Sequence, residues 1–421
     1  MGTRESAGDK PKKRFPLRKI LGVFLILAIG LGIGSILYWQ RLEALIRNRN
    51  SRKIDDLVNA PTPGQPVTFL IIGCDSRGKN DPGRSDTLMV VRINPTKKIV
   101  SIISIPRDTR VRIPGHGKDK INAAYAIGDG ELALKTVKQF TGLEFNHYVS
   151  VDFLGFKKIV DALGGIDINV QPPGGKSRLV DPDIGLNLPK GMQHLNGDEA
   201  LKFVRVRHVD DDFGRTKRQQ QFLKAVFDKA LDPTSLVKLP GLPQLLAENL
   251  QTDSGLSLQD MLSYFLAVRS MPKENIHMAT LPGDPKWIGD VSYVIPDDTK
   301  VTSYFERMKY DLPFELTKEE LANAAITVDV ENGCGVAGRG RALGDLLGAR
   351  GFTIGIIGDA ERSDHERTQI LASSETYDDA KKVRDALGMG EIVSDPTNGQ
   401  ALTVVVGRDF NDPADPASGS N

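Results

Sequence analysis

Arginine side chains are concentrated between positions 205 and 219 of this chain. Arg205 and Arg207 are two residues apart, so the spacing predicts a strand that carries both side chains on one face. Val204 and Val206 would then point into a core. The guanidinium group makes two-pronged contacts with phosphate oxygens, which favours a phosphate-binding role for this arginine pair.

A second polar pair follows on the next element. Arg215 and Gln219 are four residues apart, and on a helix that opens near Gly214 they share a face. Two converging pairs predict a pocket for a highly charged phosphate group. From spacing alone the alternative is a solvated, charged strand with surface ion pairs. Further arginine and aspartate residues at the ends of other predicted strands would favour the phosphate pocket over the solvated strand.

Two aspartates bracket a glycine-rich loop nearer the N-terminus. Asp75 follows an apolar run and Asp86 follows the loop, which contains Gly78 and Gly83. We expect the two carboxylates to meet at the base of the loop, where they suit a metal–pyrophosphate site completed by substrate oxygens. Asp-rich loops are also common turn formers, which is the competing interpretation.

Further charged segments follow the predicted strands. Arg84 lies at the end of the glycine-rich loop, Arg107 and Asp108 end an apolar run, and residues 118–122 follow a turn. Strand ends and helix starts are where sites in open sheets gather. The sequence therefore predicts one anion-binding site assembled from several loops.

Apolar runs of strand length alternate with helical patterns over a first domain at residues 67–315. Strands are predicted at 67–73, 87–93, 99–105, 147–151 and 166–170, and helices at 131–140, 152–163, 215–231, 257–269 and 299–310. This alternation favours an α/β fold with a mixed central sheet flanked by helices. Apolar residues of the helices at 131–140 and 152–163, Phe153 and Phe156 among them, would line a lipid slot or simply fill the core.

A separate, small α/β domain is predicted at residues 325–410. It contains strands at 326–331, 352–358 and 402–406, with helices at 339–349 and 377–387. The segment 333–338 matches the pattern GxGxxG after a strand, as a dinucleotide fingerprint does. The domain is too short for a full dinucleotide-binding fold, so we interpret the motif as a tight glycine turn. Residues 411–421 are expected to be a disordered tail.

The N-terminus predicts a membrane location. A basic segment at 1–19 precedes an uncharged apolar run at 20–39, which is long enough to cross a bilayer as one helix, and a proline-rich linker occupies 40–66. No small-residue cleavage site follows the run, so we expect an uncleaved signal anchor. The prediction is a single-pass protein of the cell membrane, with a cytoplasmic N-terminus and an extracytoplasmic catalytic domain.

The overall composition argues against other classes of protein. A formal net charge of +1 gives no basic field for bulk binding of nucleic acid, and the short segment before the apolar run has no helix-turn-helix. The two cysteines, Cys74 and Cys334, lack CxxC or Cys/His spacing, which argues against a zinc site. We interpret both as unpaired, buried residues.

Taken in order, the motifs resemble the LytR-CpsA-Psr family, whose members are membrane-anchored transferases that attach glycopolymers to the bacterial cell wall. The matching segments are GCDSR at 73–77, RSDT at 84–87, SIPRD at 104–108, KINAAY at 120–125, GGI at 164–166, LNGDEA at 195–200 and the run 205–219. They cover about residues 67 to 230. Cys74 replaces the family's usual small residue before the first aspartate. Residues 330–335 resemble the accessory LytR C-terminal domain.

The resemblance implies a phosphotransferase that moves a glycopolymer from a polyprenyl-(pyro)phosphate carrier to a sugar hydroxyl of peptidoglycan. It implies that Asp75 and Asp86 hold Mg²⁺, or Mn²⁺ in its place. The pyrophosphate would be gripped by Arg84, Arg107, Arg205, Arg207 and Arg215, with Gln219 beside them.

Catalysis would then depend on Arg84, Arg107, Arg215 and Asp212, with Asp212 or Asp75 accepting the hydroxyl proton. The expected partners are the lipid-linked glycan donor, the peptidoglycan acceptor and the membrane, without nucleic acid. Three alternatives stay open. They are a non-catalytic scaffold that binds lipid-linked glycan, a transcription attenuator, and a pyrophosphatase in which water replaces the sugar hydroxyl.

Overall fold

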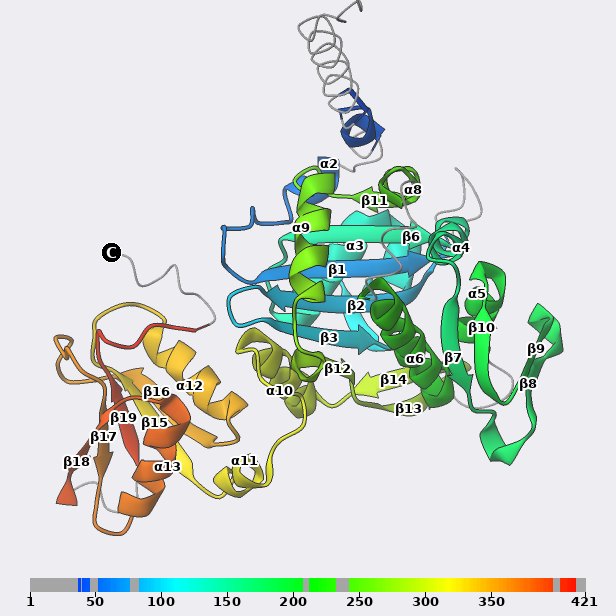
Figure 1. Cartoon of the computed structure of the whole chain (residues 1–421). Coiled ribbons are helices and arrows are strands. Elements are labelled where there is room, and N and C mark those ends of the chain that lie inside the picture. Colours follow the sequence, from blue (N-terminus) through cyan, green and yellow to red (C-terminus); the bar gives the residue numbers. More distant parts are fainter. Residues whose placement is uncertain are drawn as a thin grey trace, which may run out of the picture.

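The computed structural model describes residues 37–38, 40–45, 52–75, 83–206, 212–231, 242–396 and 402–413, which form two α/β units (Figure 1). The side chains of residues 52–53, 212–213, 215–216, 223, 227, 230–231 and 242–243 are not described. Within these ranges, no helix combines the length and the apolar character needed to cross a membrane. The span expected at 20–39 falls outside them, except for residues 37 and 38.

A six-stranded mixed sheet forms the centre of the first unit, in the order β11-β6-β1-β2-β3-β12. The strands are β1 (Val67–Cys74), β2 (Ser85–Asn94), β3 (Ile99–Ile105), β6 (His147–Asp152), β11 (Leu250–Thr252) and β12 (Ile276–Thr280). Strand β1 is parallel to β6 and antiparallel to β2, while β3 is antiparallel to β2 and parallel to β12. Four strands therefore run in one direction and end at the same edge, where β2 begins.

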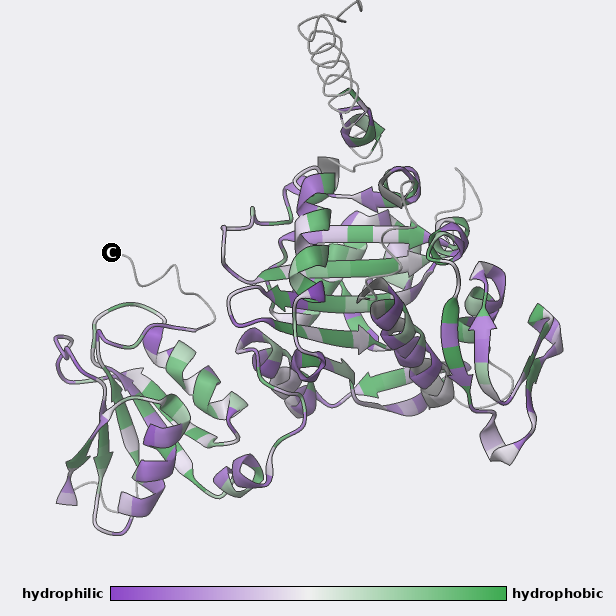
Figure 2. Ribbon diagram, viewed as in Figure 1, coloured by the Kyte–Doolittle hydropathy of each residue, from purple (hydrophilic) through white to green (hydrophobic). Residues whose placement is uncertain are grey.

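Successive side chains of each strand point to opposite faces of the sheet, so both faces of this sheet are apolar. Helices cover both of them. Leu70 and Ile72 of β1 face α2 (Arg52–Asp55), α3 (Ala123–Thr141) and α10 (Asp298–Lys309). Phe69 faces the opposite way, and its ring meets Tyr264 of α9 (Leu258–Arg269) edge-on at 5.3 Å. Figure 2 shows the apolar colouring of the strands between these helices. The predicted α/β class with a mixed central sheet is confirmed.

A smaller layer packs at the edge where the strands end. It contains α4 (Phe153–Ala162), β7 (Ile166–Val170), β10 (Gly191–Leu195), α5 (Gly197–Arg205), α6 (Asp212–Leu231) and the hairpin β8 (Arg178–Asp181) and β9 (Leu186–Pro189). Its own core includes Ile166, Phe203 and Phe222. Short 3₁₀ turns lie at Pro173–Gly175, Pro182–Ile184 and Lys273–Asn275. The layer brings α4, α5 and α6 over the strand ends.

The strand predicted through Arg205 is wrong, because Arg205 is the last residue of helix α5. The Asn196 side chain accepts a hydrogen bond from the N–H of Glu199 at 2.9 Å, and the Glu199 carboxylate accepts one from the N–H of Asn196 at 3.1 Å. This capping box starts a helix that outweighs the local alternation of apolar and charged residues. The next helix, α6, begins at Asp212, two residues before the Gly214 start that we predicted.

The segment after the expected membrane span is attached to the first unit. Leu42 is 1% exposed and packs with Ala247 of α8 (Leu242–Asn249) and with Leu258. The Glu43 carboxylate accepts a hydrogen bond from the N–H of Leu258 at 3.1 Å. Ile54 is also 1% exposed, in the main core. Parts of the stretch that we expected to be a linker are thus docked on the domain.

The second unit has a five-stranded sheet in the order β16-β15-β19-β17-β18. Its strands are β15 (Thr327–Asn332), β16 (Thr353–Asp359), β17 (Gln369–Ala372), β18 (Glu391–Ser394) and β19 (Thr403–Val406), with helices α11 (Lys318–Asn323), α12 (Arg339–Ala349) and α13 (Tyr377–Leu387). Gly335 and Gly338 have φ values of +74° and +82°, so the GxGxxG segment is a glycine turn before α12. Cys74 and Cys334 are buried and form no disulfide, as we interpreted.

A buried carboxylate, that of Asp311, connects the two units. Asp311 accepts hydrogen bonds from Asn94 at 2.7 Å and Lys97 at 2.9 Å, and it lies 3.5 Å from the guanidinium of Arg92. Burial lowers the pKa of Arg92, and the neighbouring Asp311 carboxylate acts in the opposite direction. The adjacent residues Tyr310 and Leu312 belong to the core of the second unit. Asp311 therefore fixes the chain where one unit passes into the other.

Replacing Asp311 by alanine would remove the carboxylate that pairs with the buried guanidinium of Arg92. We expect Asp311→Ala to reduce the free energy of unfolding by about 3–5 kcal/mol, because an uncompensated buried charge is costly. Denaturant unfolding followed by circular dichroism measures this change. As a control, Asp378→Ala removes an exposed ion pair with Lys381 on α13 and should leave the midpoint unchanged. Equal midpoints for the two variants would contradict the assignment.

Candidate functional site

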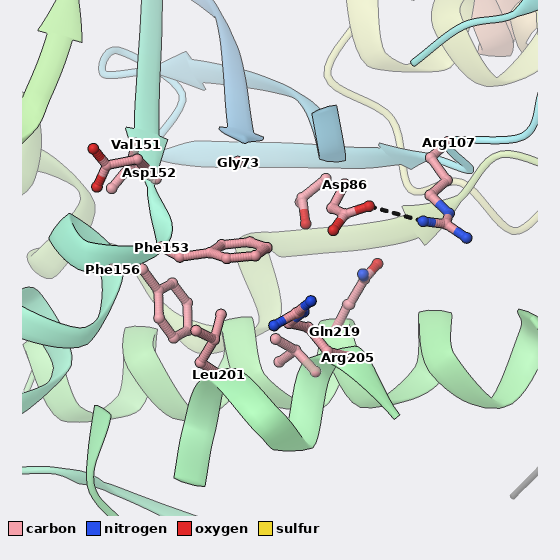
Figure 3. Close-up of a pocket in the computed structure, with 12 residues that line it drawn as sticks. Gly73, Asp86, Arg107, Val151, Asp152, Phe153, Phe156, Leu201, Arg205 and Gln219 are labelled. Carbon is pink, nitrogen blue, oxygen red and sulfur yellow. Dashed lines mark hydrogen bonds and ion pairs between the residues drawn. The ribbon is translucent and has the colours of Figure 1, made fainter. Parts of the chain in front are cut away.

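A cleft lies between the edge of the central sheet where the strands end and the helices α4, α5 and α6 (Figure 3). It is lined by Gly73, Asp86, Thr87, Arg107, Val151, Asp152, Phe153, Phe156, Leu201, Val204, Arg205 and Gln219. Four of the predicted site residues, from segments far apart in the sequence, therefore line one cleft: Asp86, Arg107, Arg205 and Gln219. The carboxyl ends of parallel strands are where ligands bind in open α/β sheets.

A β-bulge places Asp86 in the cleft. Gly73 pairs with Thr87 while Cys74 pairs with Ser85, so Asp86 is an extra residue in β2. A bulge of this kind bends the strand and redirects a side chain. Gly73 contributes no side chain to the cleft floor, and a Cβ atom there would lie only 3.3 Å from the Cβ of Thr87. The sheet thus stays open beside the Asp86 carboxylate.

Asp75 closes the base of the loop between β1 and β2. Its N–H donates to the carbonyl of Arg84 at 3.1 Å, and its carboxylate accepts from the N–H of Arg84 at 2.6 Å. Asp75 does not line the cleft. It directly follows β1, the strand that pairs with the Asp86 strand β2. The Arg84 side chain is exposed and is not among the lining residues. The phosphate contact expected of Arg84 stays a prediction.

Arg107 is held in the cleft by carboxylates on two sides. Its Nη1 lies 2.8 Å from Oδ1 of Asp86, and its Nε lies 3.4 Å from Oδ2 of Asp108. Lys120 in turn contacts Asp108 at 2.7 Å. The Arg107 side chain is 15% exposed, so these contacts are only weakly screened by water. The network fixes the direction of the guanidinium before any anion arrives.

Arg205 and Gln219 enter the cleft from the helical side. Arg205 ends α5 and Gln219 lies on α6; in Figure 3 the Gln219 amide points toward Asp86 and Arg107, and the Arg205 guanidinium lies by the Phe153 ring. The buried Arg218 donates from Nη2 to the carbonyl of Val206 at 2.9 Å. This bond ties α6 to the residue after α5 and so holds the two helices together at the cleft.

Apolar side chains form the other half of the cleft. Phe153 and Phe156 come from α4, and Leu201 and Val204 come from α5. The guanidinium carbon of Arg205 lies 4.5 Å from the centre of the Phe153 ring, which is a cation–π contact at the boundary of the two halves. The cleft therefore offers cations and hydrogen-bond donors beside an aromatic and aliphatic wall. This combination suits an amphiphile with a phosphate head and an apolar chain.

The apolar residues of α4 had two open interpretations, the wall of a lipid slot or plain core. Phe153 and Phe156 line the cleft, while Val160 of the same helix is buried in the core of the smaller layer. The apolar residues of the helix expected at 131–140 fill the core on the opposite face of the sheet, Leu134 and Val137 among them. Leu154 is 61% exposed. For the helix expected at 131–140, the interpretation as plain core is confirmed.

The side chains of three predicted site residues are not among those that the structure describes. Arg207 lies outside the described residues. Asp212 and Arg215 belong to α6, but their side chains are outside the description. Their roles in catalysis and in phosphate binding stay predictions.

Sequence reasoning missed the apolar contribution of α5. Leu201, Val204 and Arg205 are spaced as i, i+3 and i+4, so they share one face of the helix and all three line the cleft. The capping box at Asn196 and Glu199 was the signal that could have revealed this helix. Asp152 was missed too, and it caps α4 by accepting from the N–H of Gly155 at 2.7 Å.

The two predicted metal ligands fit a magnesium ion in number and type. Mg²⁺ is usually bound by one or two carboxylates and completes its shell with phosphate oxygens and water. Asp75, which directly follows β1, and Asp86 of β2 offer two carboxylates, and of these two only Asp86 lines the cleft. No group of three or more His, Cys, Asp or Glu side chains placed to hold a metal is found among the described residues. Oxygens of the substrate would therefore have to complete the shell.

Two buried tyrosines lie in the core below the sheet edge. Burial is the main cause that raises the pKa of Tyr125 and of Tyr148 well above the usual range. Both phenols thus stay protonated at neutral pH. They are unsuited to accept a proton from a sugar hydroxyl.

Comparison with known proteins gives a consistent grouping. Residues 40–310 match the model of the LytR_cpsA_psr family, and residues 325–410 match a model described as LytR cell envelope-related transcriptional attenuator. The chain is 33% identical over 319 residues to polyisoprenyl-teichoic acid–peptidoglycan teichoic acid transferase TagV of Bacillus subtilis, covering 71% of this chain and 79% of the relative. It is 35% identical over 294 residues to the TagU transferase of Bacillus anthracis, covering 67% and 92%.

A solved structure resembles the first unit as well. The crystal structure of B. subtilis TagV superposes with a TM-score of 0.53 at 32% sequence identity, covering 60% of this chain and 98% of that chain. The first family model alone spans more than half of the 421 residues. The protein therefore belongs to the LytR-CpsA-Psr family.

Proposed function

We propose that this protein is a transferase that moves a glycopolymer from a polyprenyl-phosphate-linked carrier to a sugar hydroxyl of peptidoglycan. The observation that carries the proposal is the two-sided cleft, which Arg107 and Arg205 line together with Phe153 and Phe156. The names of the relatives support it, since both are polyisoprenyl-teichoic acid–peptidoglycan teichoic acid transferases. The chain covers most of the length of each relative.

The cationic half would bind the phosphate groups of the donor. Phosphoryl transfer needs mainly positioning and neutralisation of negative charge, and little covalent chemistry from the protein. Arg107 and Arg205 would supply that charge, while the Gln219 amide would hydrogen-bond a phosphate oxygen. Because Asp86 and Asp108 already fix Arg107, little conformational entropy is lost when the anion binds.

The apolar half would hold the first units of the lipid and keep water away from the reacting phosphorus. Phe153, Phe156 and Leu201 form a wall that a hydrated sugar would not favour. Exclusion of water favours attack by the sugar hydroxyl over hydrolysis. The acceptor hydroxyl would attack phosphorus, the bond to the lipid phosphate would break, and the lipid phosphate would leave.

We also propose that the reaction depends on Mg²⁺ or Mn²⁺ held by Asp75 and Asp86 together with oxygens of the donor. A bound divalent ion would neutralise charge on the phosphates. Asp86 contacts Arg107 at 2.8 Å, so the same carboxylate would link the ion to the arginine. We further propose that residues 20–39 anchor the chain in the cell membrane, with the cleft on the extracytoplasmic side.

Loss of the fixed cation should slow transfer strongly. We expect Arg107→Ala to lower kcat by about 10²–10³, the usual effect of removing one preorganised donor that stabilises transition-state charge. Arg107→Lys should recover little, because a lysine cannot contact Asp86 and a phosphate with a planar fork. The measurement is the mass of glycan transferred to soluble peptidoglycan fragments from a polyprenyl-pyrophosphate-linked glycan.

Arg362→Ala provides the matched control for that experiment. Arg362 is an exposed arginine of the second unit, paired with Asp364 at 2.8 Å and far from the cleft in sequence. It should leave transfer unchanged. Wild-type rates for Arg107→Ala in a folded protein would mean that the arginine cluster has been misread. Tight donor binding by the wild type without any turnover would favour the scaffold alternative.

Chelation should separate a metal-dependent reaction from a purely cationic one. We expect EDTA to abolish transfer and added Mg²⁺ or Mn²⁺ to restore it. Asp86→Asn should raise the Mg²⁺ concentration needed for half-maximal rate by at least about tenfold, because one ligand loses its charge. Asp167→Asn, at an exposed carboxylate paired with His194 on β7 and β10, should not change it. Full activity in EDTA would exclude the proposed ion.

A further inference from the structure

The β13–β14 hairpin extends from the sheet edge that ends with β12. It consists of β13 (Gly283–Ile288) and β14 (Val291–Pro296) joined by a two-residue turn in which Gly289 has a φ of +59°. The N–H of Val294 donates to the carbonyl of Asp108 at 2.9 Å, and Thr109 forms an isolated parallel bridge with Val294. The hairpin is therefore bonded through its backbone to the residues that directly follow Arg107.

One face of the hairpin is used to attach it to the site. The ring of Tyr293 lies 5.5 Å from the guanidinium of Arg110 and 5.8 Å from the ammonium of Lys120. These cations belong to the neighbouring hairpin of β4 (Arg110–Ile113) and β5 (Gly117–Lys120). Lys120 also contacts Asp108. Cation–π contacts thus connect this face of the hairpin to the network that holds Arg107.

The opposite face of the hairpin presents an exposed indole ring. Trp287 pairs with Ser292 across the strands, and the neighbouring pair is Lys286 with Tyr293. Because successive pairs point to opposite faces, Trp287 lies on the face away from Tyr293. It is 70% exposed and belongs to none of the buried clusters of the described residues. A side chain with this much apolar surface is typical of contact sites with a partner.

The position of the hairpin indicates which partner it meets. Residues 40–45 dock beside α8 and α9, near the β11 edge of the sheet, whereas the hairpin continues from β12 at the opposite edge (Figure 1). Six strands separate those edges by about 24 Å, at about 4.8 Å per spacing. A chain anchored through residues 20–39 would therefore keep Trp287 on the side away from the bilayer, toward the cell wall.

We propose that the Trp287 face of the β13–β14 hairpin binds sugar rings of the acceptor glycan. The inference rests on the proposed function and adds to it the place where peptidoglycan docks. One face of a pyranose carries C–H bonds with partial positive charge, which suit the negative face of an indole. Ser292, the partner of Trp287 across the strands, shares this face and supplies a hydroxyl group beside the ring.

The geometry also fits transfer at the neighbouring site. Ser292 lies two residues before Val294, and Trp287 is its partner across the hairpin. Strand rise and spacing place Trp287 on the order of 10 Å from the bond between Val294 and Asp108. A glycan strand bound by Trp287 would thus run past the segment that carries Arg107, with a following sugar hydroxyl near the cleft.

Fluorescence of the full chain tests binding without any donor. The chain has two tryptophans, Trp39 and Trp287, so Trp39→Phe leaves Trp287 as the only indole reporter. We expect a saturable blue shift when uncrosslinked peptidoglycan strands are added, and no shift with vesicles of anionic phospholipid. No shift with glycan would overturn the inference. A shift with vesicles instead would also overturn it and would make the hairpin a membrane-contacting element.

Transfer kinetics test the same surface in the reaction. We expect Trp287→Ala to raise the KM for the acceptor by about tenfold, with kcat and the affinity for the donor unchanged, as for loss of uniform binding. Trp287→Phe should recover part of the loss. Ile356→Ala, at a side chain 74% exposed on β16 of the second unit, is the matched control.

The two proposals fail in different ways. Glycan binding through Trp287 in a protein that never transfers would contradict the proposed function and support the docking surface. Normal transfer with an unchanged acceptor KM in Trp287→Ala would contradict the docking surface alone. Thermal unfolding of the variants should match the wild type, because Trp287 contributes to none of the described buried clusters.

Discussion

The site depends on the contact of Arg107 with two carboxylates. A free arginine would sample many rotamers, and an anion that bound it would have to order it first. Here Asp86 and Asp108 hold the guanidinium from two sides, and Lys120 balances the charge of Asp108. The β-bulge at Asp86, the shared direction of four strands and the two hairpins beyond β3 all serve this arrangement. Positive charge is thereby fixed in place at a sheet edge.

The second requirement is that charge and apolar surface meet within one cleft. The sheet supplies the fixed cation and the carboxylates, while α4 and α5 supply the aromatic and aliphatic wall. Arg205 joins the two, because it ends α5 beside Gln219 and lies against the ring of Phe153. The central sheet and the smaller layer that contains α4, α5 and α6 have separate hydrophobic cores. Each half of the cleft is therefore supported by its own core.

The sequence predicted the central strands closely, and also the helices α4 and α6, but it missed helix α5. Continuous apolar runs at 67–73 and 99–105 have few alternatives to buried strands, and they match β1 and β3. Arg205 was misplaced because apolar and charged residues alternate locally, although the capping box at Asn196 favoured a helix. The bulge at Asp86 depends on strand register, which no local pattern encodes. The hairpin at 283–296 was overlooked, despite the turn signal of Gly289 and Asp290.

With the proposed anchor in the membrane, the docking of Leu42 and Ile54 would set how far the catalytic domain can reach. A catalytic domain on a free tether would sweep a volume that grows with the length of its linker. Here the linker between the proposed span and the first docked residue, Leu42, would be very short. The cleft would consequently work at a nearly constant height above the bilayer. Wall strands beyond that height would be out of range, so polymer would be added to the innermost, newly made layer.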